Sequence, residues 1–507
     1  MNSSSKKAIN GIITSAINFF VLIMLQMLVT PLILKISGQD ILGAYSIVMQ
    51  IIGYGIILDF GLAVALNRFL SQSFNKNDNY IQFTKVFNVA RYFSLMTSML
   101  IAIFILIILT NLDSVISSNE EIIGSIEKAL VIFAVWSILK AFFIVHSHAL
   151  FASQNMVFVN LVDLIVAVSR LLLSILLVTL EYGLIGLVAA NVISEFIGLF
   201  IKRLKFNKLY PKINLSWRNL DVKLSRKIFS FGLTYWGVNV AIVMTIGSDS
   251  IVIGHLYGVA LASVFYTTKI PSYLITQIIY KISDNTAPVF NEVISENNHN
   301  RARFYYYRVL LFSLLLAIPA AIAIIKFNKD VVTLWVGVEQ YAGDLMTFAL
   351  AMFVVTQVVN HVNAMVVVAI GDMKYWIHLS LFTAFMTILS SYFLGRAYGI
   401  EWIMISISIM DIPTLVFLIF RSAERLKIKG EEVLVRIIKP VALVSLPLVG
   451  WVLYTAEVDK VITLSGTILE IFTFLALWLI LIYGLGVEHS DRELIKYKIY
   501  RCKKWLF

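Results

Sequence analysis

Long apolar runs limit the fold of this chain more than any other feature of its sequence. Many stretches of about 20 residues carry almost no charged side chain, and a helix needs about that length to cross a hydrocarbon core of about 30 Å. Of the 507 residues, 59% are hydrophobic and 14% are charged, and the mean hydropathy is +0.86. A water-soluble globular protein does not have this composition, so we expect the bilayer to be the solvent of the chain.

We therefore predict an all-α polytopic membrane protein with about fourteen transmembrane helices. The predicted spans are 8–34, 41–66, 86–110, 129–153, 157–180, 184–201, 228–247, 251–281, 304–326, 345–370, 375–395, 399–420, 436–455 and 463–487. The first span follows Lys6 and Lys7, as the apolar part of a signal peptide would. It is too long for that role and lacks a small-residue cleavage site, so it is kept as the first helix.

Basic residues gather in alternate loops, and this asymmetry predicts the orientation. With the N-terminus in the cytoplasm, most of the 41 Lys and Arg residues fall inside, including those of 202–227, 421–430 and the tail 497–507. The predicted outer loops carry acids: Asp113, Glu120, Glu121, Glu181, Glu339, Asp344 and Glu457. The positive-inside rule then places both termini in the cytoplasm. The net charge of +11 is that of a rim facing anionic lipid and requires no nucleic acid as a partner.

The sequence offers no motif for catalysis or for a metal. Cys502 is the only cysteine, so there is no disulfide framework and no Cys/His spacing for a metal. A phosphate-binding GxxxxGK[ST] loop and a Ser/His/Asp spacing are also missing. The longest hydrophilic stretch, about 202–227, is a short basic connector. We expect no enzyme activity, no metal and no cofactor, and place the function among the helices.

The chain carries a weak internal repeat. The stretch YGLIGLVAANVISEFIGLFIKRLK, from Tyr182, aligns with YGIEWIMISISIMDIPTLVFLIFRSAERLK, from Tyr398, on Tyr-Gly, on an acid (Glu195 and Asp411) and on a basic end. Near an offset of 220 residues, SGQDILGAYSIVMQI aligns with YGVALASVFYTTKIP. Helices one to six and seven to twelve are thus predicted to be parallel copies. The predicted domains are a six-helix bundle (1–205), a basic cytoplasmic connector (206–227), a second six-helix bundle (228–425), and two extra helices with a basic cytoplasmic tail (426–507).

Two stretches resemble a known family. The stretch GQDILGAYSIVMQIIGYGIILDFGLAVALNRFLSQ, which ends in Asp-x-Gly-Leu and Arg68, resembles the start of the polysaccharide transporter branch of the MOP superfamily. The stretch FSFGLTYWGVNVAIVMTIGSDSIVIGHLYGVALASVFYTTKIPSYL resembles its seventh and eighth helices, with Asp249 at the family's usual aspartate. The resemblance covers about residues 8–420. It implies a Wzx-type flippase of lipid-linked oligosaccharides, similar to lipid II flippases and more distantly to MATE exporters.

Three cations lie deep in predicted helices, where a charge costs at least about 2.5 to 3.5 kcal/mol and therefore indicates function. Lys140, Arg170 and Lys269 lie about 17, 20 and 27 Å along their helices. Each belongs to a polar stripe at helical spacing, as the wall of a cavity should. The stripes are Lys140 with Ser147 and Gln154, Arg170 with Asn160, Asp163 and Ser174, and Lys269 with Ser272 and Thr276. Facing helices offer Asn18, Asn239, Gln357, Asn360 and His361. Such a cavity favours an anion such as a lipid diphosphate.

Structural interpretations stand beside these functional ones. Arg170 has Asp163 two turns earlier on the same helix face, so the two side chains are alternatively an ion pair. His361 is alternatively a packed polar residue of the core. Asp59 and Arg68 fall near the predicted cytoplasmic end of their helix, either as an interfacial helix end with Arg68 extended to the surface or as a gate of the cavity.

The resemblance implies a transporter that moves an undecaprenyl-diphosphate-linked oligosaccharide, as a unit of O-antigen or of another surface polysaccharide, to the outer leaflet of the bacterial cytoplasmic (inner) membrane. We expect alternating access of two bundles around a central cationic cavity, with H⁺ or Na⁺ as a coupling ion and Asp59, Asp163 or Asp249 as its sites. Expected partners are membrane lipid, a polysaccharide polymerase and a chain-length regulator. The alternatives are a MATE-like exporter of cationic drugs, which would need intramembrane acids, and a membrane glycosyltransferase, which would need catalytic carboxylates or a large soluble loop.

Overall fold

The computed structural model describes residues 3–74, 80–153, 155–211, 213, 221–296, 298–456 and 463–486. Gln154, Lys212, Glu457 and Cys502, the predicted tail after 486, and residues 214–220 of the predicted connector lie outside the described residues. The described part contains helices and turns and no strand. This confirms the predicted all-α class.

The helical elements follow one another in short order along the chain. They are α1 (Ser3–Gly53), η1 (Tyr54–Asp59), α2 (Leu62–Ser73), α3 (Ile81–Leu109), α4 (Leu112–Val115), α5 (Glu120–Ala152), α6 (Met156–Thr179), α7 (Gly183–Leu209), α8 (Val222–Ile246), α9 (Asp249–Tyr257), α10 (Val259–Ser295), α11 (His299–Val336), η2 (Val338–Gln340), α12 (Asp344–Ile370), α13 (Lys374–Tyr398), α14 (Glu401–Met410), α15 (Ile412–Leu426), α16 (Gly430–Val433), η3 (Leu434–Ile438), α17 (Lys439–Ala456), α18 (Leu464–Leu481) and η4 (Ile482–Gly486).

Twelve helices in the described part are long and apolar enough to cross a membrane, two fewer than predicted. The predicted spans 8–34 and 41–66 overlap the stretch Asn18–Asp59, which counts as one of the twelve although a kink at Gly38 divides α1 into two helices, as predicted. The predicted span 251–281 is divided between α9 and α10, and α10 is absent from the twelve because many of its residues are polar. The predicted extra helices 436–455 and 463–487 correspond to α17 and α18.

Two glycines turn the chain at corresponding positions of the predicted repeat. Gly38 interrupts α1 with φ 84° and ψ 176°, and Gly258 separates α9 from α10 with φ 87° and ψ 170°. Other residues rarely adopt this backbone conformation, so both turns depend on glycine. The two glycines are 220 residues apart, the offset at which the sequences align. The backbone therefore repeats where the sequence predicts a repeat.

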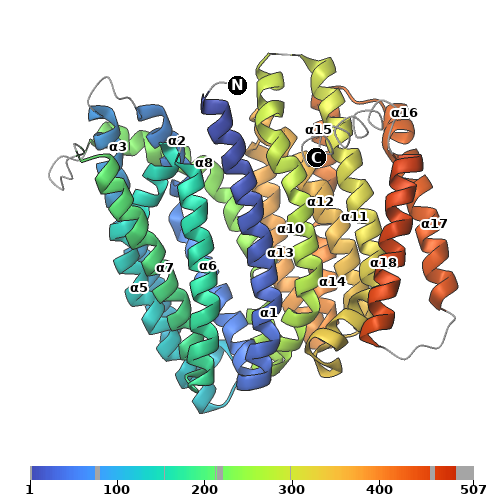
Figure 1. Cartoon of the computed structure of the whole chain (residues 1–507), viewed down its shortest axis with the longest axis horizontal. Helices are drawn as coiled ribbons and strands as arrows, with labels where there is room; N and C mark the ends of the chain where they lie inside the picture. Colours follow the sequence, from blue (N-terminus) through green and yellow to red (C-terminus); the bar gives the residue numbers. More distant parts are fainter. Residues whose placement is uncertain are drawn as a thin grey trace, which may run out of the picture. The chain divides into compact units, whose positions relative to one another are not determined.

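Packing divides the chain into two compact units, Met1–Tyr266 and Thr267–Phe507. In the first unit α1 packs on α6, α6 on α7, and α3 and α7 on α5 (Figure 1). A core of aromatic rings joins α3 to α7, where Phe87 and Phe206 stack with their centroids 5.1 Å apart. The predicted domain limits follow the sequence repeat and stay a prediction.

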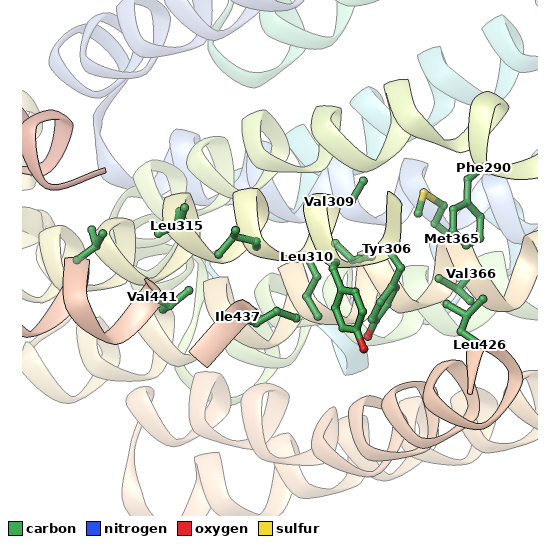
Figure 2. Packing of buried hydrophobic residues seen from close by; sticks show 14 of the residues in the cluster. Phe290, Tyr306, Val309, Leu310, Leu315, Met365, Val366, Leu426, Ile437 and Val441 are labelled. Carbon is green, nitrogen blue, oxygen red and sulfur yellow. The ribbon is translucent and has the colours of Figure 1, made fainter. Parts of the chain in front are cut away.

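The second unit is built on α11, which packs against α12 and α17. Its core includes Tyr306, Leu315, Val366 and Ile437, and Figure 2 shows these side chains converging between the helices. The buried residues come from α10, α11, α12, α15, η3, α17 and α18, so the two C-terminal helices belong to the same core.

A break interrupts the predicted span 41–66. After η1, Phe60 (φ 51°) and Gly61 (φ 68°) are both left-handed, and α2 starts at Leu62. A side chain added at Gly61 would lie 2.2 Å from the carbonyl oxygen of Gly232, so α8 packs directly against the break. The Trp236 indole N–H donates to the carbonyl oxygen of Ile57 at 2.5 Å. The helix predicted to be continuous is thus two helices joined at a glycine.

Candidate substrate and ion sites

Lys140 is paired with an acid that the sequence does not place beside it. Its ammonium, on α5, lies 2.5 Å from the carboxylate of Glu195 on α7. The Trp136 indole N–H donates to the same carboxylate at 2.7 Å. The side chains of Lys140 and Glu195 are 32% and 31% exposed, so the pair is largely buried within the first unit.

Asp163 is paired with Lys202, not with Arg170. The Lys202 ammonium lies 2.6 Å from an Asp163 carboxylate oxygen. The sequence assigns Lys202 to the basic stretch after helix six, but α7 continues to Leu209 and the residue is 6% exposed. The predicted alternative of an Arg170–Asp163 pair therefore does not describe this structure.

Arg170 has no ion pair among the described residues. Its Nε is buried without a hydrogen-bond partner in that part of the chain. Its charge acts on Glu195 and on Tyr45, whose hydroxyl accepts a hydrogen bond from the Asn191 amide at 3.0 Å. Sequence reasoning missed Tyr45 and Asn191, because the hydrogen bond between them joins two helices, α1 and α7, that are far apart in the sequence. Arg170 is thus a half-buried cation beside a pair that is already neutralised.

The two predicted asparagines of the first unit differ in their surroundings. Asn18, on α1, has a buried Oδ1 that finds no partner within the described ranges. Asn239 is half-buried on α8. Each remains a predicted substrate contact.

Asp249 joins the start of α9 to α1. Its carboxylate accepts hydrogen bonds from the Gln50 amide and, at 2.7 Å, from the Ser250 backbone N–H. The Gln50 Oε1 accepts from the backbone N–H of Ile251 at 3.2 Å. The residue is 2% exposed. These contacts hold α9 against α1, and its predicted role in ion coupling stays a prediction.

The opening motif of the resemblance, Asp59 with Arg68, organises the helix break. Asp59 accepts a hydrogen bond from the backbone N–H of Ala63 at 3.0 Å, in the first turn of α2. The Arg68 guanidinium stacks over the ring of Phe231 on α8, 4.4 Å from its centroid. The first residue thus stabilises the start of α2 and the second stabilises its contact with α8.

In the second unit, Asp411 is a half-buried carboxylate held by amides. The Gln357 and Asn360 side chains of α12 donate to its Oδ2 at 3.0 and 2.5 Å. The Tyr280 hydroxyl donates to Gln357 Oε1 at 3.0 Å. Asn360 is 8% exposed, and its Oδ1 has no hydrogen-bond partner in the described part. Two acceptors, a carboxylate and an amide oxygen, therefore occur in one place.

His361 and Lys269 are the other predicted site residues of this unit. His361 Nε2 lies 2.8 Å from Asp284 Oδ1, and the ring of His361 stacks on Tyr280 with centroids 3.9 Å apart. His361 is one third exposed, so it is not a fully packed core residue. Lys269 is half-buried on α10.

The corresponding carboxylates of the two repeat copies have different partners. Glu195 and Asp411 align in the repeat, and Asn360 follows Lys140 by 220 residues. Where the first copy supplies an ammonium to its carboxylate, the second supplies an amide. No group of three or more His, Cys, Asp or Glu side chains in the described residues is placed to hold a metal ion.

Comparison with known proteins identifies the family. The family described as "Polysaccharide biosynthesis protein" matches residues 36–342, more than half of the chain. The chain belongs to this family. The match includes the broken helix, α5 to α9 and α10, so the family's sequence pattern covers the pairs around Lys140 and Asp163. No curated protein matches the sequence.

Solved structures share the fold of this family member. A lipid II flippase, MurJ, in an inward closed conformation is 16% identical over 92% of this chain and 98% of its own, with a TM-score of 0.68. An inward-facing multidrug resistance MATE family transporter of the MOP superfamily is 18% identical over 81% and 98%, with a TM-score of 0.63. A MOP superfamily transporter from Pyrococcus furiosus, reported for the reverse polarity of its binding pocket, is 18% identical over 82% and 95%, with a TM-score of 0.59. The chain is a multi-pass membrane protein with a MOP superfamily fold.

Proposed function

We propose that the protein is a flippase that moves an undecaprenyl-diphosphate-linked oligosaccharide from the cytoplasmic to the outer leaflet of a bacterial inner membrane. The proposal rests on the surroundings of Arg170. A guanidinium inside a membrane bundle is stable only with a counter-charge or water, and no described carboxylate pairs with this one. A diphosphate supplies that counter-charge in the bidentate form that suits arginine.

The proposed mechanism is alternating access without a chemical reaction. The diphosphate would bind Arg170, with Asn18 and Asn239 as further polar contacts in the first unit and with Lys269, Asn360 and His361 as proposed contacts in the second. The polyprenyl chain would remain in lipid, so no bond is broken. The family and the flippase among the structural neighbours support a lipid-linked substrate. A polysaccharide polymerase and a chain-length regulator are the proposed partners.

Asp411 is the residue we propose for the coupling ion. Its carboxylate is held by uncharged amides, beside the unpaired Asn360 Oδ1. A proton or Na⁺ would balance its charge, as the Lys140 ammonium balances Glu195. In the variant Asn360→Lys a resident ammonium would occupy this place, so we expect export that no longer responds to the ion gradient. Unchanged gradient dependence in a folded Asn360→Lys protein would exclude Asp411 as the ion site.

A MATE-like exporter of cationic compounds is the second candidate. The half-buried carboxylate of Asp411 favours this candidate too, because such an exporter needs acids within the membrane. The two functions differ in what a deletion does. Loss of a flippase leaves lipid-linked oligosaccharide in the cytoplasmic leaflet and abolishes the surface glycan. Loss of a drug exporter sensitises cells to cationic dyes and leaves the glycan normal. We expect the first result, and the second would replace the proposal.

Binding to Arg170 is tested on the purified protein with undecaprenyl diphosphate. A charge-assisted contact contributes about 1.5 to 3 kcal/mol, so Arg170→Gln should weaken binding about tenfold or more. Arg170→Lys should keep part of the affinity, because it keeps the charge and loses the bidentate geometry. Arg396→Gln, at an exposed arginine of α13, is the matched control and should bind as the wild type does. Wild-type affinity of Arg170→Gln would remove the proposed anion site.

A further inference from the structure

Two arginines of the first unit lie inside their helices, away from the loops. Arg91 is on α3, about 15 Å from the start of the helix, and Arg203 is on α7, about 9 Å before its end. Both are half-buried, and both helices count among the candidate membrane spans. The positive-inside rule places these two helix ends at the cytoplasmic side. The proposed flippase mechanism uses neither residue.

The two guanidinium groups lie close enough for their charges to repel each other. Both charges also act on the imidazole of His146, on α5, against which α3 and α7 both pack. The His146 Nδ1 lies 3.1 Å from the carbonyl oxygen of Phe143. The Nε2 of the same ring is buried and finds no hydrogen-bond partner in the described part of the chain. Three helices therefore bring two cations and an unsatisfied imidazole nitrogen into one region.

The acids of the neighbouring helices do not balance this charge. In α3 there is no Asp or Glu, and the acids of α5 lie in its first turns, at the opposite end of the helix. The carboxylate of Glu195 is held by Lys140, and that of Asp163 by Lys202. Among the described residues, no ion pair includes Arg203. A charge within a membrane span is costly without a counter-charge, so the partner to expect is an anion from outside the chain.

An apolar surface adjoins Arg203. Its guanidinium stacks over the ring of Phe143 on α5, 5.1 Å from the centroid, and this contact holds it against the bundle. The exposed side chains of Phe196, Phe200 and Leu204 recur every four residues, on one face of α7. From Arg203 this face runs toward the middle of the membrane. A cation above an apolar strip matches the order of headgroup and acyl chains in a phospholipid.

We propose that Arg91 and Arg203 form a binding site for one anionic phospholipid of the cytoplasmic leaflet. Basic pockets between transmembrane helices on that side bind the headgroups of such lipids. The phosphate diester lies against the two guanidinium groups, whose geometry suits bidentate contacts, and the acyl chains follow the apolar strip of α7. The bound lipid removes the repulsion between the two arginines and links α3 to α7. This site differs from the general basic rim, whose lysines are exposed at helix ends and in loops.

The test measures lipid binding, so it does not depend on export or on the proposed flippase function. The full-length protein is delipidated in a neutral detergent, and phosphatidylglycerol or phosphatidylcholine is added to the micelles. Melting temperature and native mass spectrometry report the binding. We expect phosphatidylglycerol to raise the melting temperature more than phosphatidylcholine does, with one molecule retained. Arg203→Gln and Arg91→Gln should each weaken this binding about tenfold or more, whereas Arg203→Lys should keep part of it.

Lys208→Gln is the matched control, because it removes the same charge from an exposed position in the last turn of α7. It should bind phosphatidylglycerol as the wild type does. The change in melting temperature on addition of lipid is compared, so the lost stacking of Arg203 on Phe143 does not enter the result. Unchanged binding in Arg203→Gln, or equal weakening in Lys208→Gln, would overturn the proposal. Equal stabilisation by inorganic phosphate would exclude a phospholipid as the ligand.

Discussion

The role of a charged side chain within the membrane depends on its partners on other helices. The depth of Lys140 on its helix predicts a binding role, but its ammonium lies against Glu195. If the pair is structural, removing one partner strands the other charge, and removing both does not. Lys140 and Arg170 therefore call for different experiments, although the sequence alone treats them alike.

Lys140→Gln should lower the stability of the protein by about 1.5 to 3 kcal/mol, because Glu195 loses a charge-assisted hydrogen bond. The double change Lys140→Gln with Glu195→Gln should recover most of the stability and of glycan export. Melting temperature and surface glycan are the two measurements. A double variant that is stable yet exports nothing would return Lys140 to the substrate site.

Asp372, in the turn between α12 and α13, predicts a pH effect. The hydrogen bond from Arg425 at 2.6 Å, with Arg421 beside it, holds the pKa of this carboxyl below its usual range. A lowered folded-state pKa stabilises the fold above the unfolded pKa of about 3.9, and this contribution is lost as the pH falls through the folded value. Asp372→Asn should therefore melt lower than the wild type at neutral pH, and the difference should vanish on acidification.

A matched control separates this effect from a general loss of acid. Asp113→Asn changes an exposed acid without a described ion pair, so its melting temperature should follow that of the wild type at every pH. A constant difference between Asp372→Asn and the wild type down to low pH would contradict the ionic origin.

Sequence reasoning found the deep cations but not their partners, for a physical reason. Spacing along one helix predicts contacts at three or four residues, whereas Glu195 and Lys202 reach their partners from a helix that packs beside them. Asp411 was visible as an intramembrane acid through the repeat, and its amide partners on α12 were not. Arg170 was found because its charge and its depth along the helix can be read from the sequence without knowledge of a partner.

At the scale of elements, hydropathy predicts which segments lie in the membrane but not where their backbone turns. Residues 54–61 are as apolar as their flanks, so the span 41–66 was predicted as one helix. The break depends on two residues with a left-handed backbone conformation and on the close approach of α8. Neither can be inferred from the amino-acid composition of the segment. Broken helices inside a membrane occur where they line a cavity, as this one does.

Gly61→Ala tests the break. The added methyl group would lie 2.2 Å from the Gly232 carbonyl oxygen, and the left-handed φ of 68° disfavours a side chain. We expect a loss of about 1 to 3 kcal/mol and a lower melting temperature. Gly124→Ala, in α5 with nothing within 4 Å, should be neutral or slightly stabilising. Equal stability of the two variants would show that α8 does not need the close contact at Gly61.

At the scale of the whole chain, the repeat and the positive-inside rule are the predictions that carry most weight. The turns at Gly38 and Gly258 agree with the repeat offset. The number of crossings depends on α10, which has 37 residues and is long enough to cross a bilayer of about 30 Å, yet is too polar to count among the twelve apolar candidates.

Reporter fusions decide the topology and the status of α10 together. Between Glu120 and Lys427 lies an even number of the twelve candidate spans, and counting α10 as a further crossing makes the number odd. We expect α10 to cross, because the turn at Gly258 joins it directly to α9 and because its polar residues can line a cavity. A fusion after Lys427 should then report the cytoplasm and one at Glu120 the exterior, as the positive-inside rule also predicts. Both fusions on one side would mean that α10 does not cross, and the exterior at Lys427 would reverse the orientation.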